Sequence, residues 1–264
     1  MSNRIKERNK MKLKTINGME IEPEPESKVK TPANDTEITS RDWRIVVGIP
    51  CHGIVKPLTC VSFASLIGES VNNGLQIAIM EDQSGSITMA RNNLVRRSMQ
   101  MQATHLLMVD SDMVFPPFGL LQLCNSLTLL QKSGEKVAAV CATYPKRVQP
   151  YELLGETVEP LKVGDSGLKE AVFVPSGFML FDLKAFNDIE RPWFAETYQT
   201  WAVREENIDG VVGEDVYFCL RAKDAGYKVF IDLEVTKRMG HLGDIIAVWD
   251  QREITNVDET PKPE

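Results

Sequence analysis

The sequence predicts an α/β protein, a three-layer α/β/α sandwich with a mostly parallel central sheet, on the strength of two observations. Short apolar runs alternate with segments of helical periodicity between residues 44 and 143. The apolar runs are also rich in β-branched residues and too short for helices, which is typical of buried strands. Strands that alternate with helices form a parallel sheet with helices packed on its faces.

The first half of the chain divides into four strands and three helices. We expect strands at 44–50, 75–80, 104–109 and 137–143, and helices at 59–72, 87–102 and 116–133. The first helix ends at Asn72-Asn73-Gly74, a pattern typical of helix C-termini. Ser84 or Ser86 is expected to cap the second helix, and two prolines from Pro116 onward are expected to open the third.

The second half is less regular. Segments 171–174 and 178–182 flank Pro175-Ser176-Gly177, and they indicate strand, turn and strand, or a strand entering a helix. A helix at 214–226, a strand at 227–233 and a loop at 240–243 are expected to follow. Residues 1–41 and 251–264 contain few large apolar residues to bury, so we expect disordered polar tails around a domain at 42–250.

Charge and cysteine content restrict the class of protein. The net charge of -7 argues against a large electrostatic footprint on nucleic acid. The five cysteines form no CxxC pair, and free buried thiols suit a reducing compartment. No segment approaches the roughly 20 apolar residues that cross a bilayer. The basic N-terminus lacks the apolar region of a secretory signal, so we expect a cytoplasmic protein.

Polar residues follow three of the predicted strands. These are Pro50-Cys51-His52-Gly53, Glu81-Asp82-Gln83-Ser84 and Asp110-Ser111-Asp112. Ligands of open α/β sheets bind beyond the carboxyl ends of the strands. The sequence therefore predicts a binding site at this edge of the sheet.

Asp110 and Asp112 suggest a metal ion at this edge. Residues two apart on a strand point the same way, so the two carboxylates would repel each other without a positive charge between them. Mg²⁺ and Mn²⁺ prefer oxygen ligands and can keep coordination positions open for phosphate. A capped helix start or a solvated turn is the alternative interpretation of this tripeptide.

Several motifs, taken in order, give the chain a family resemblance. They are RIVVGIP at 44–50, ITMARNNLVRRSM at 87–99, HLLMVDSDMVFP at 105–116, VPSGFMLF at 174–181, GEDVYFCLRAKDAGYKVF at 213–230 and GHLG at 240–243. With this set the chain resembles the GT-A fold glycosyltransferases, particularly those related to family 2, from about Arg44 to about Trp249. The resemblance implies transfer of a sugar from a nucleotide-sugar donor to an acceptor hydroxyl.

The resemblance also implies roles for the acidic residues. Asp110 and Asp112 would hold Mn²⁺ or Mg²⁺ against the donor diphosphate, and His241 would add a ligand from a loop that swings over the site. Asp215 would be the general base of an inverting reaction, and Glu214 would orient the acceptor or the base. The alternative for this pair is two acids that stabilise the N-terminus of a helix.

Other residues are implied to contact the donor. Arg91 would face the diphosphate near Asp110 and Ser111, and Ser176 and Gly177 would line the sugar pocket. The residues expected to read the base are Pro50, Glu81 and Ser84. The segment after Pro50 departs from the usual opening of the family, so the identity of the base stays open.

The acceptor is expected to lie over residues 192–213. Trp193, Tyr198 and Trp201 could stack on a sugar or a base, and core packing is the alternative for them. The acceptor could be a glycan, a lipid-linked sugar, a protein or a modified base in DNA. Compact relatives occur in bacteriophages, which suggests the cytoplasm of a bacterium or of a phage-infected host.

Two other functions are weighed against this one. A metal-dependent nucleotidyltransferase usually has a basic Gly-rich loop after the first strand, whereas GIPCHG lacks a basic residue and Lys56 is only near. A non-catalytic sugar-nucleotide-binding protein would be favoured by loss of the Asp110-Ser111-Asp112 or Glu214-Asp215 motif, and both are intact.

Overall fold

A computed structural model describes residues 43–51, 53–147, 152–162, 164–203, 206–243 and 246–248 of the chain. For residues 201–203, 206–208 and 246–248 it describes the backbone alone. The tails expected at 1–41 and 251–264 lie outside the described residues. All elements below belong to one compact unit, Glu37–Glu264.

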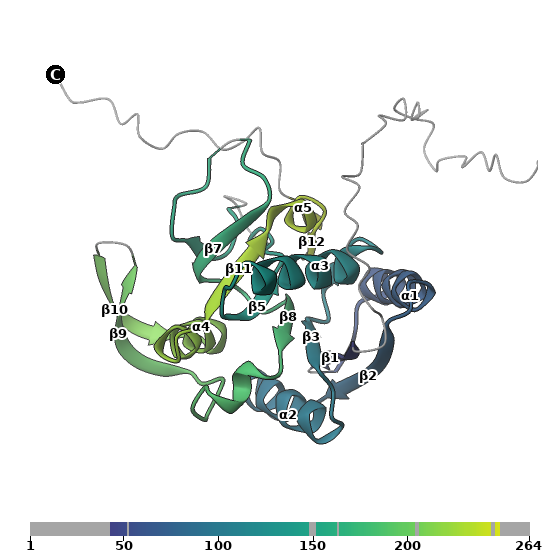
Figure 1. The fold of residues 1–264 in the computed structure, drawn as a ribbon, viewed down its shortest axis with the longest axis horizontal. Coiled ribbons are helices and arrows are strands. Elements are labelled where there is room, and N and C mark those ends of the chain that lie inside the picture. The colour runs from purple at the N-terminus through teal and green to yellow at the C-terminus, as the bar shows by residue number, and fades with distance from the viewer. Residues whose placement is uncertain are drawn as a thin grey trace, which may run out of the picture. The chain divides into compact units, whose positions relative to one another are not determined.

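The central sheet has eight strands in the order β2-β1-β3-β8-β5-β11-β7-β6 (Figure 1). Their bounds, in that order, are Gln76–Asp82, Arg44–Pro50, His105–Val109, Phe178–Asp182, Val137–Cys141, Lys228–Asp232, Leu168–Phe173 and Glu156–Thr157. β8 and β7 run antiparallel to their neighbours, and the other strands share one direction. The mostly parallel sheet is therefore confirmed.

Helices cover both faces of the sheet (Figure 1). One buried cluster contains side chains of α1 (Pro57–Asn72) and α3 (Gly119–Lys132) together with Val235 of α5 (Leu233–Thr236). The other contains side chains of α2 (Ile87–Gln100), α4 (Glu214–Asp224) and the short 3-10 helix η2 (Ala185–Asn187). The three-layer sandwich is thus confirmed.

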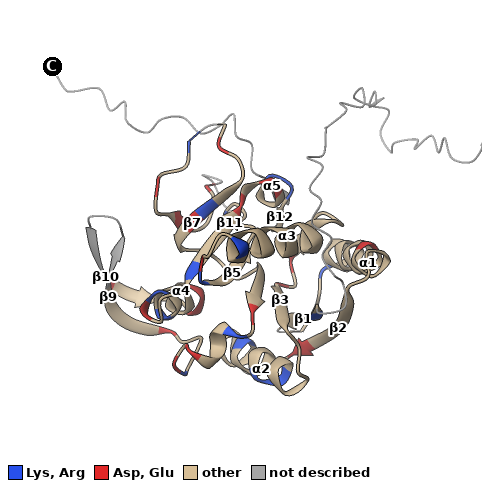
Figure 2. Cartoon of the chain, viewed as in Figure 1, with Lys and Arg blue, Asp and Glu red and all other residues tan. Residues whose placement is uncertain are grey.

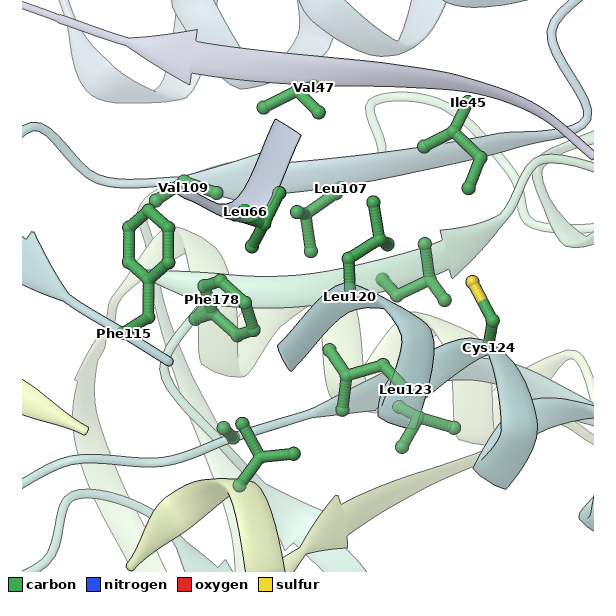
Figure 3. Packing of buried hydrophobic residues seen from close by; sticks show 14 of the residues in the cluster. Ile45, Val47, Leu66, Leu107, Val109, Phe115, Leu120, Leu123, Cys124 and Phe178 are labelled. Carbon is green, nitrogen blue, oxygen red and sulfur yellow. The ribbon is translucent and has the colours of Figure 1, made fainter. Parts of the chain in front are cut away.

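β3 shows why the sequence forms these layers. Leu107 and Val109 join the cluster under α1 and α3, whereas Leu106 and Met108 join the opposite cluster, as the alternation of strand side chains requires. Figure 3 shows Leu107 and Val109 near Phe178 of β8 and Leu120 of α3. Each such side chain contributes about 1.5–3 kcal/mol on burial.

Two helix starts resolve or correct the predictions. The Ser86 hydroxyl accepts the N–H of Met89 at 3.2 Å, so Ser86, and not Ser84, caps α2. The third helix begins at Gly119 and not at Pro116. The Gly119 N–H donates to the Pro116 carbonyl at 3.0 Å in a turn before the helix. A residue that precedes a proline disfavours the helical conformation, which excludes Pro116 from α3.

Short strands replace two predicted loops. β12 (Gly240–Leu242) pairs with β4 (Met113–Val114) and β13 (Ile246–Val248), so 240–242 form a strand. β9 (Thr197–Val203) and β10 (Glu206–Val212) form a hairpin within the expected acceptor loop. Pairing satisfies backbone groups that a loop would leave to water.

Pro175-Ser176-Gly177 separates two strands, as one interpretation required, but the two do not form a hairpin. β8 lies between β3 and β5, whereas β7 pairs with β11 and β6.

The five cysteines all lie in the described part of the chain and are free. Four of them are buried, and Cys60 is exposed. Burial raises the pKa of Cys219 to about 12, so this thiol stays protonated and unreactive at neutral pH. Within the described residues, no helix combines the length and apolar character needed to cross a membrane.

Candidate active site

Asp110-Ser111-Asp112 forms a turn directly after β3. The Met113 N–H donates to the Asp110 carbonyl at 3.4 Å, and the Asp110 N–H donates to the Gly177 carbonyl at 3.0 Å. The strand alternation that we applied to the two aspartates therefore does not hold, because the strand has ended at Val109. Their carboxylates have different partners instead.

Arg91 contacts three of the other predicted residues. Its side chain is 3% exposed, with Nη2 3.1 Å from Asp110 Oδ1 and Nε 3.2 Å from Glu214 Oε1. Nη1 donates to the Ser176 carbonyl at 3.5 Å. Burial alone would lower the pKa of Arg91, but the charges of Asp110 and Glu214 more than offset it and raise the pKa. Arg91 is therefore a fixed cation at the centre of the site.

Asp215 lies next to this ion-pair network, in the first turn of α4. Its Oδ1 accepts the N–H of Val216 at 2.8 Å. Burial and, second, the charge of Glu214 raise the pKa of Asp215 to about 6, although Val216 and Arg91 partly oppose the shift. A carboxylate with a pKa near neutrality can accept a proton at physiological pH.

Asp112 lies beside His241 of β12. The Leu242 N–H donates to the Asp112 carbonyl at 2.9 Å, and Asp112 Oδ2 is 3.8 Å from His241 Nε2. His241 Nδ1 lies 2.9 Å from the Pro145 carbonyl, which accepts only if Nδ1 carries the proton. The lone pair of Nε2 then accepts the Nε–H of Arg147 at 2.8 Å. Burial lowers the pKa of His241, which favours this neutral form.

The predicted swinging loop around His241 is wrong. His241 is 7% exposed and paired on both sides within the sheet of β4, β12 and β13. Tyr144 also packs against it, with ring centroids 4.8 Å apart. The imidazole is thus held in place before any ligand binds.

The segment after β5 is a part of the site that the sequence did not reveal. Tyr144 accepts the Gly177 N–H at 3.1 Å, and Arg147 contacts both Asp112 and His241. A Cβ on Gly177 would come within 2.6 Å of Tyr144 Cζ, so Tyr144 is the steric reason for glycine here. Its position could have identified this segment as part of the site, because it follows the carboxyl end of a parallel strand.

Asp112 and His241 form a donor set that fits a divalent cation. A carboxylate oxygen and an imidazole nitrogen suit Mn²⁺, with its remaining positions open to phosphate and water. Among the described residues, no group of three or more His, Cys, Asp or Glu side chains could hold a metal ion. A bound ion would therefore be held by Asp112 and His241 together with phosphate or water, whereas Asp110 is paired with Arg91.

The end of β2 is organised around Asp82. Asp82 accepts the Ser84 N–H at 3.0 Å and the Ser84 hydroxyl, and Asn93 Nδ2 donates to Ser84 Oγ at 2.9 Å. Arg97 Nη1 lies 3.5 Å from Asp82 Oδ2, and Figure 2 shows the basic residues of α2 near this acidic strand end.

The other predicted base-reading residues lie at the same place. Pro50 is buried opposite Asp82 in the β1–β2 register, and Glu81 is exposed, with Oε2 3.2 Å from Gln83 Nε2. The base-reading roles of Pro50, Glu81 and Ser84 stay predictions.

The three predicted acceptor aromatics have different positions. Trp193 is 3% exposed, and its Nε1–H donates to the Ile189 carbonyl at 3.1 Å, so it belongs to the core and the acceptor role is wrong. Its large apolar ring is better buried against Phe186 than exposed. Tyr198 is 68% exposed on β9, and the side chain of Trp201 lies outside the described residues.

Comparison with solved structures identifies the fold. The fold is similar to that of protein A197 from STIV. The two chains are 17% identical, with a TM-score of 0.51 over 84% of this chain and 100% of A197.

Weaker similarities link the chain to S. aureus TarS 1-349 in complex with UDP-GlcNAc (15% identity, TM-score 0.42, 72% of this chain and 56% of that one). They also link it to a Drosophila β1,4-galactosyltransferase 7 mutant in complex with manganese, UDP-Gal and xylobiose (13%, 0.43, 83% and 82%). At 17% identity the likeness to A197 concerns the fold alone. No protein-family model and no curated protein matches the chain.

Proposed function

We propose that this protein is a divalent-cation-dependent glycosyltransferase that moves a sugar from a nucleotide-sugar donor to an acceptor hydroxyl. The observation that carries the proposal is the state of Asp215. Its pKa of about 6 belongs to a carboxylate that lies beside an ion-pair network of Arg91, Asp110 and Glu214. Perturbed carboxylates at a strand-end site are candidates for acid–base catalysis.

The donor side of the proposed site is made by Asp112, His241 and the turn at Ser176. A cation bound by Asp112 and His241 would neutralise charge that develops on the diphosphate leaving group. Ser176 Oγ is buried and has no hydrogen-bond partner in the described part of the chain, so it could pair with a donor hydroxyl. Arg91 fixes Asp110 and the Ser176 carbonyl, which keeps this side of the site rigid.

Asp215 is the proposed general base of an inverting reaction. It would take the proton of the acceptor hydroxyl while the oxygen attacks the anomeric carbon. Glu214 stays paired with Arg91, and its negative charge raises the basicity of Asp215. Glu214 is therefore proposed as a residue that tunes and orients the base.

The proposed acceptor is a glycan or a modified base in DNA, within the cytoplasm of a bacterium or of a phage-infected host. The exposed Tyr198 on β9 is the remaining described candidate for acceptor contact. A net charge of -7 favours acceptors that do not require a basic surface.

A thermal-shift panel tests the donor. UDP-, GDP- and dTDP-sugars are added with Mn²⁺ or with EDTA, and we expect one nucleotide class to raise the Tm only with Mn²⁺, because a ligand of the native state stabilises it. Asp112→Asn should remove the Mn²⁺-dependent part of the shift. No shift with any donor would contradict the proposal.

A product assay then tests the reaction. The donor that binds is incubated with candidate glycans and with phage-type modified DNA, and mass spectrometry records any added sugar. Transfer that is lost in Asp215→Asn supports the proposal. Release of pyrophosphate from a nucleoside triphosphate and a sugar 1-phosphate would instead assign the chain to the nucleotidyltransferases.

A further inference from the structure

Each carboxylate of the Asp110-Ser111-Asp112 turn is paired with its own guanidinium. Arg91 Nη2 is 3.1 Å from Asp110 Oδ1, and Arg147 Nη2 is 2.5 Å from Asp112 Oδ2. The repulsion that made a cation seem necessary between the two aspartates is therefore already offset by protein groups. The two arginines come from α2 and from the segment after β5.

The Arg147 guanidinium contacts both atoms that would bind a cation. Its Nε–H donates to His241 Nε2 at 2.8 Å, while Nη2 contacts Asp112 Oδ2. A cation bonded to both atoms would lie between them, about 2.1 Å from each. The lone pair of His241 Nε2 cannot serve the guanidinium and a metal at once, so the two cations compete.

We propose that Arg147 blocks the cation site of the metal-free protein and that a divalent cation binds only by displacing it. The inference rests on the proposed function, since it takes Asp112 and His241 as the metal ligands. Arg147 thus acts as a self-inhibitory contact on metal binding. The apparent metal affinity is the intrinsic affinity reduced by the fraction of molecules in which Arg147 has withdrawn.

The surroundings of the two arginines show which of them can leave. Arg91 is 3% exposed and has polar contacts with Asp110, Glu214 and Ser176. The side chain of Arg147 is 50% exposed, so water can solvate its guanidinium when the two contacts break. Withdrawal of Arg147 leaves no buried charge behind once a metal ion neutralises Asp112.

Titration of the protein with Mn²⁺ tests the proposal without any sugar nucleotide. Electron paramagnetic resonance of free Mn²⁺ gives the Kd for wild type, Arg147→Ala, Arg147→Lys and Lys146→Ala. We expect Arg147→Ala to bind Mn²⁺ about tenfold more tightly or better, because the competing state is removed. Arg147→Lys should lie between this variant and wild type, since an ammonium lacks the fork that reaches both ligands.

Lys146→Ala is the matched control, because it removes the same charge one position away from Arg147. The Lys146 side chain pairs with Glu152 at 2.7 Å and not with Asp112 or His241. Its Kd should stay within about twofold of wild type. Equal gains in Lys146→Ala and Arg147→Ala, or a Kd for Arg147→Lys equal to wild type, would assign the effect to general charge and overturn the proposal. Unchanged or weaker binding by Arg147→Ala would overturn it as well.

Two further results separate this proposal from the proposed function. Asp112→Asn in the Arg147→Ala background should lose the tight Mn²⁺ site, and its retention would place the metal elsewhere and overturn the proposal. If no variant binds Mn²⁺ although a nucleotide-sugar raises the Tm in EDTA, the metal requirement and the Arg147 proposal both fail, while donor binding stands. If Arg147→Ala binds Mn²⁺ no more tightly than wild type while the donor and transfer assays succeed, the Arg147 proposal fails and the proposed function is unaffected.

Discussion

Arg91 and Glu214 are far apart in the sequence, yet Arg91 Nε lies 3.2 Å from Glu214 Oε1. The pair ties α2 to the first turn of α4 on one face of the sheet. It also places a negative charge beside Asp215, and that charge helps to raise the pKa of Asp215 to about 6. Burial is the largest cause of this shift and the charge of Glu214 adds to it, whereas Arg91 opposes it.

Removal of the Arg91 side chain should unfold or strongly destabilise the protein. Arg91→Ala leaves Asp110 and Glu214 without their shared cation in a partly buried site, and breaking such a pair costs about 3–5 kcal/mol. Denaturant unfolding measures the loss. Arg96→Ala is the control, because Arg96 is exposed on the same helix, and its free energy of unfolding should change by less than about 0.5 kcal/mol. Equal effects would show that Arg91 is not a central cation.

Asp215→Asn should abolish transfer and stabilise the protein at neutral pH. The folded pKa of Asp215 lies above its ordinary value, so its ionisation costs stability as the pH rises from about 4 through about 6. The neutral amide avoids this cost, which amounts to at most about 3 kcal/mol. Between pH 4 and pH 8, the Tm of Asp215→Asn should therefore exceed the Tm of wild type only at the higher pH values.

Asp224→Asn is the control for this comparison, because Asp224 is exposed at the other end of α4. Its Tm difference from wild type should not change sign or size between pH 5 and pH 8. In wild type, transfer measured as kcat/KM should fall below pH about 6, where Asp215 takes up a proton. A flat profile across this range would remove Asp215 from the reaction.

Ser176→Ala should separate donor binding from stability. The Ser176 hydroxyl is buried and lacks a hydrogen-bond partner among the described residues, so its removal should leave the Tm equal or higher. If Ser176 pairs with the donor sugar, the donor Kd should rise about tenfold. Ser98→Ala removes another buried, unpartnered hydroxyl, from α2, and should leave the donor Kd unchanged. An unchanged Kd in Ser176→Ala would contradict the donor contact.

Gly177→Ala should disrupt the site through Tyr144. The added Cβ would approach the buried Tyr144 hydroxyl and come within 2.6 Å of its Cζ, which forces the ring or the turn to move, at a cost of about 1–3 kcal/mol or more. Gly68→Ala is the control, since nothing lies within 4 Å of a Cβ there and α1 gains a better helix former. Tm should fall in the first variant and stay or rise in the second.

Most of the central layers could be predicted from the sequence. β1, β3 and β5 are apolar runs that are buried on both faces, and such runs are visible without knowledge of their partners. β4, β12 and β13 were missed because each has two or three residues, too few for a periodic pattern. Their pairing depends on contacts between segments distant in the chain.

The residue types of the site were also visible in the sequence. Asp110 and Asp112 follow a recognisable strand, Arg91 lies within a recognisable helix, and Glu214-Asp215 begin another. The family resemblance implied that they would gather at one site. The resemblance placed Arg91 near Asp110, but nothing in the sequence indicated that Arg91 also pairs with Glu214 or that Arg147 faces Asp112. The assignment of Arg91 to Asp110 and of Arg147 to Asp112 follows from side-chain positions in the folded chain.

The sequence by itself thus determined the layered α/β fold and the chemistry available at the strand ends, because periodicity and residue type are local properties. Only the tertiary structure decided the neutral state of His241, the raised pKa of Asp215 and the position of Arg147 on the Asp112–His241 pair. These properties are sums of burial and charge over residues that are remote in sequence, so they arise only when the chain has folded.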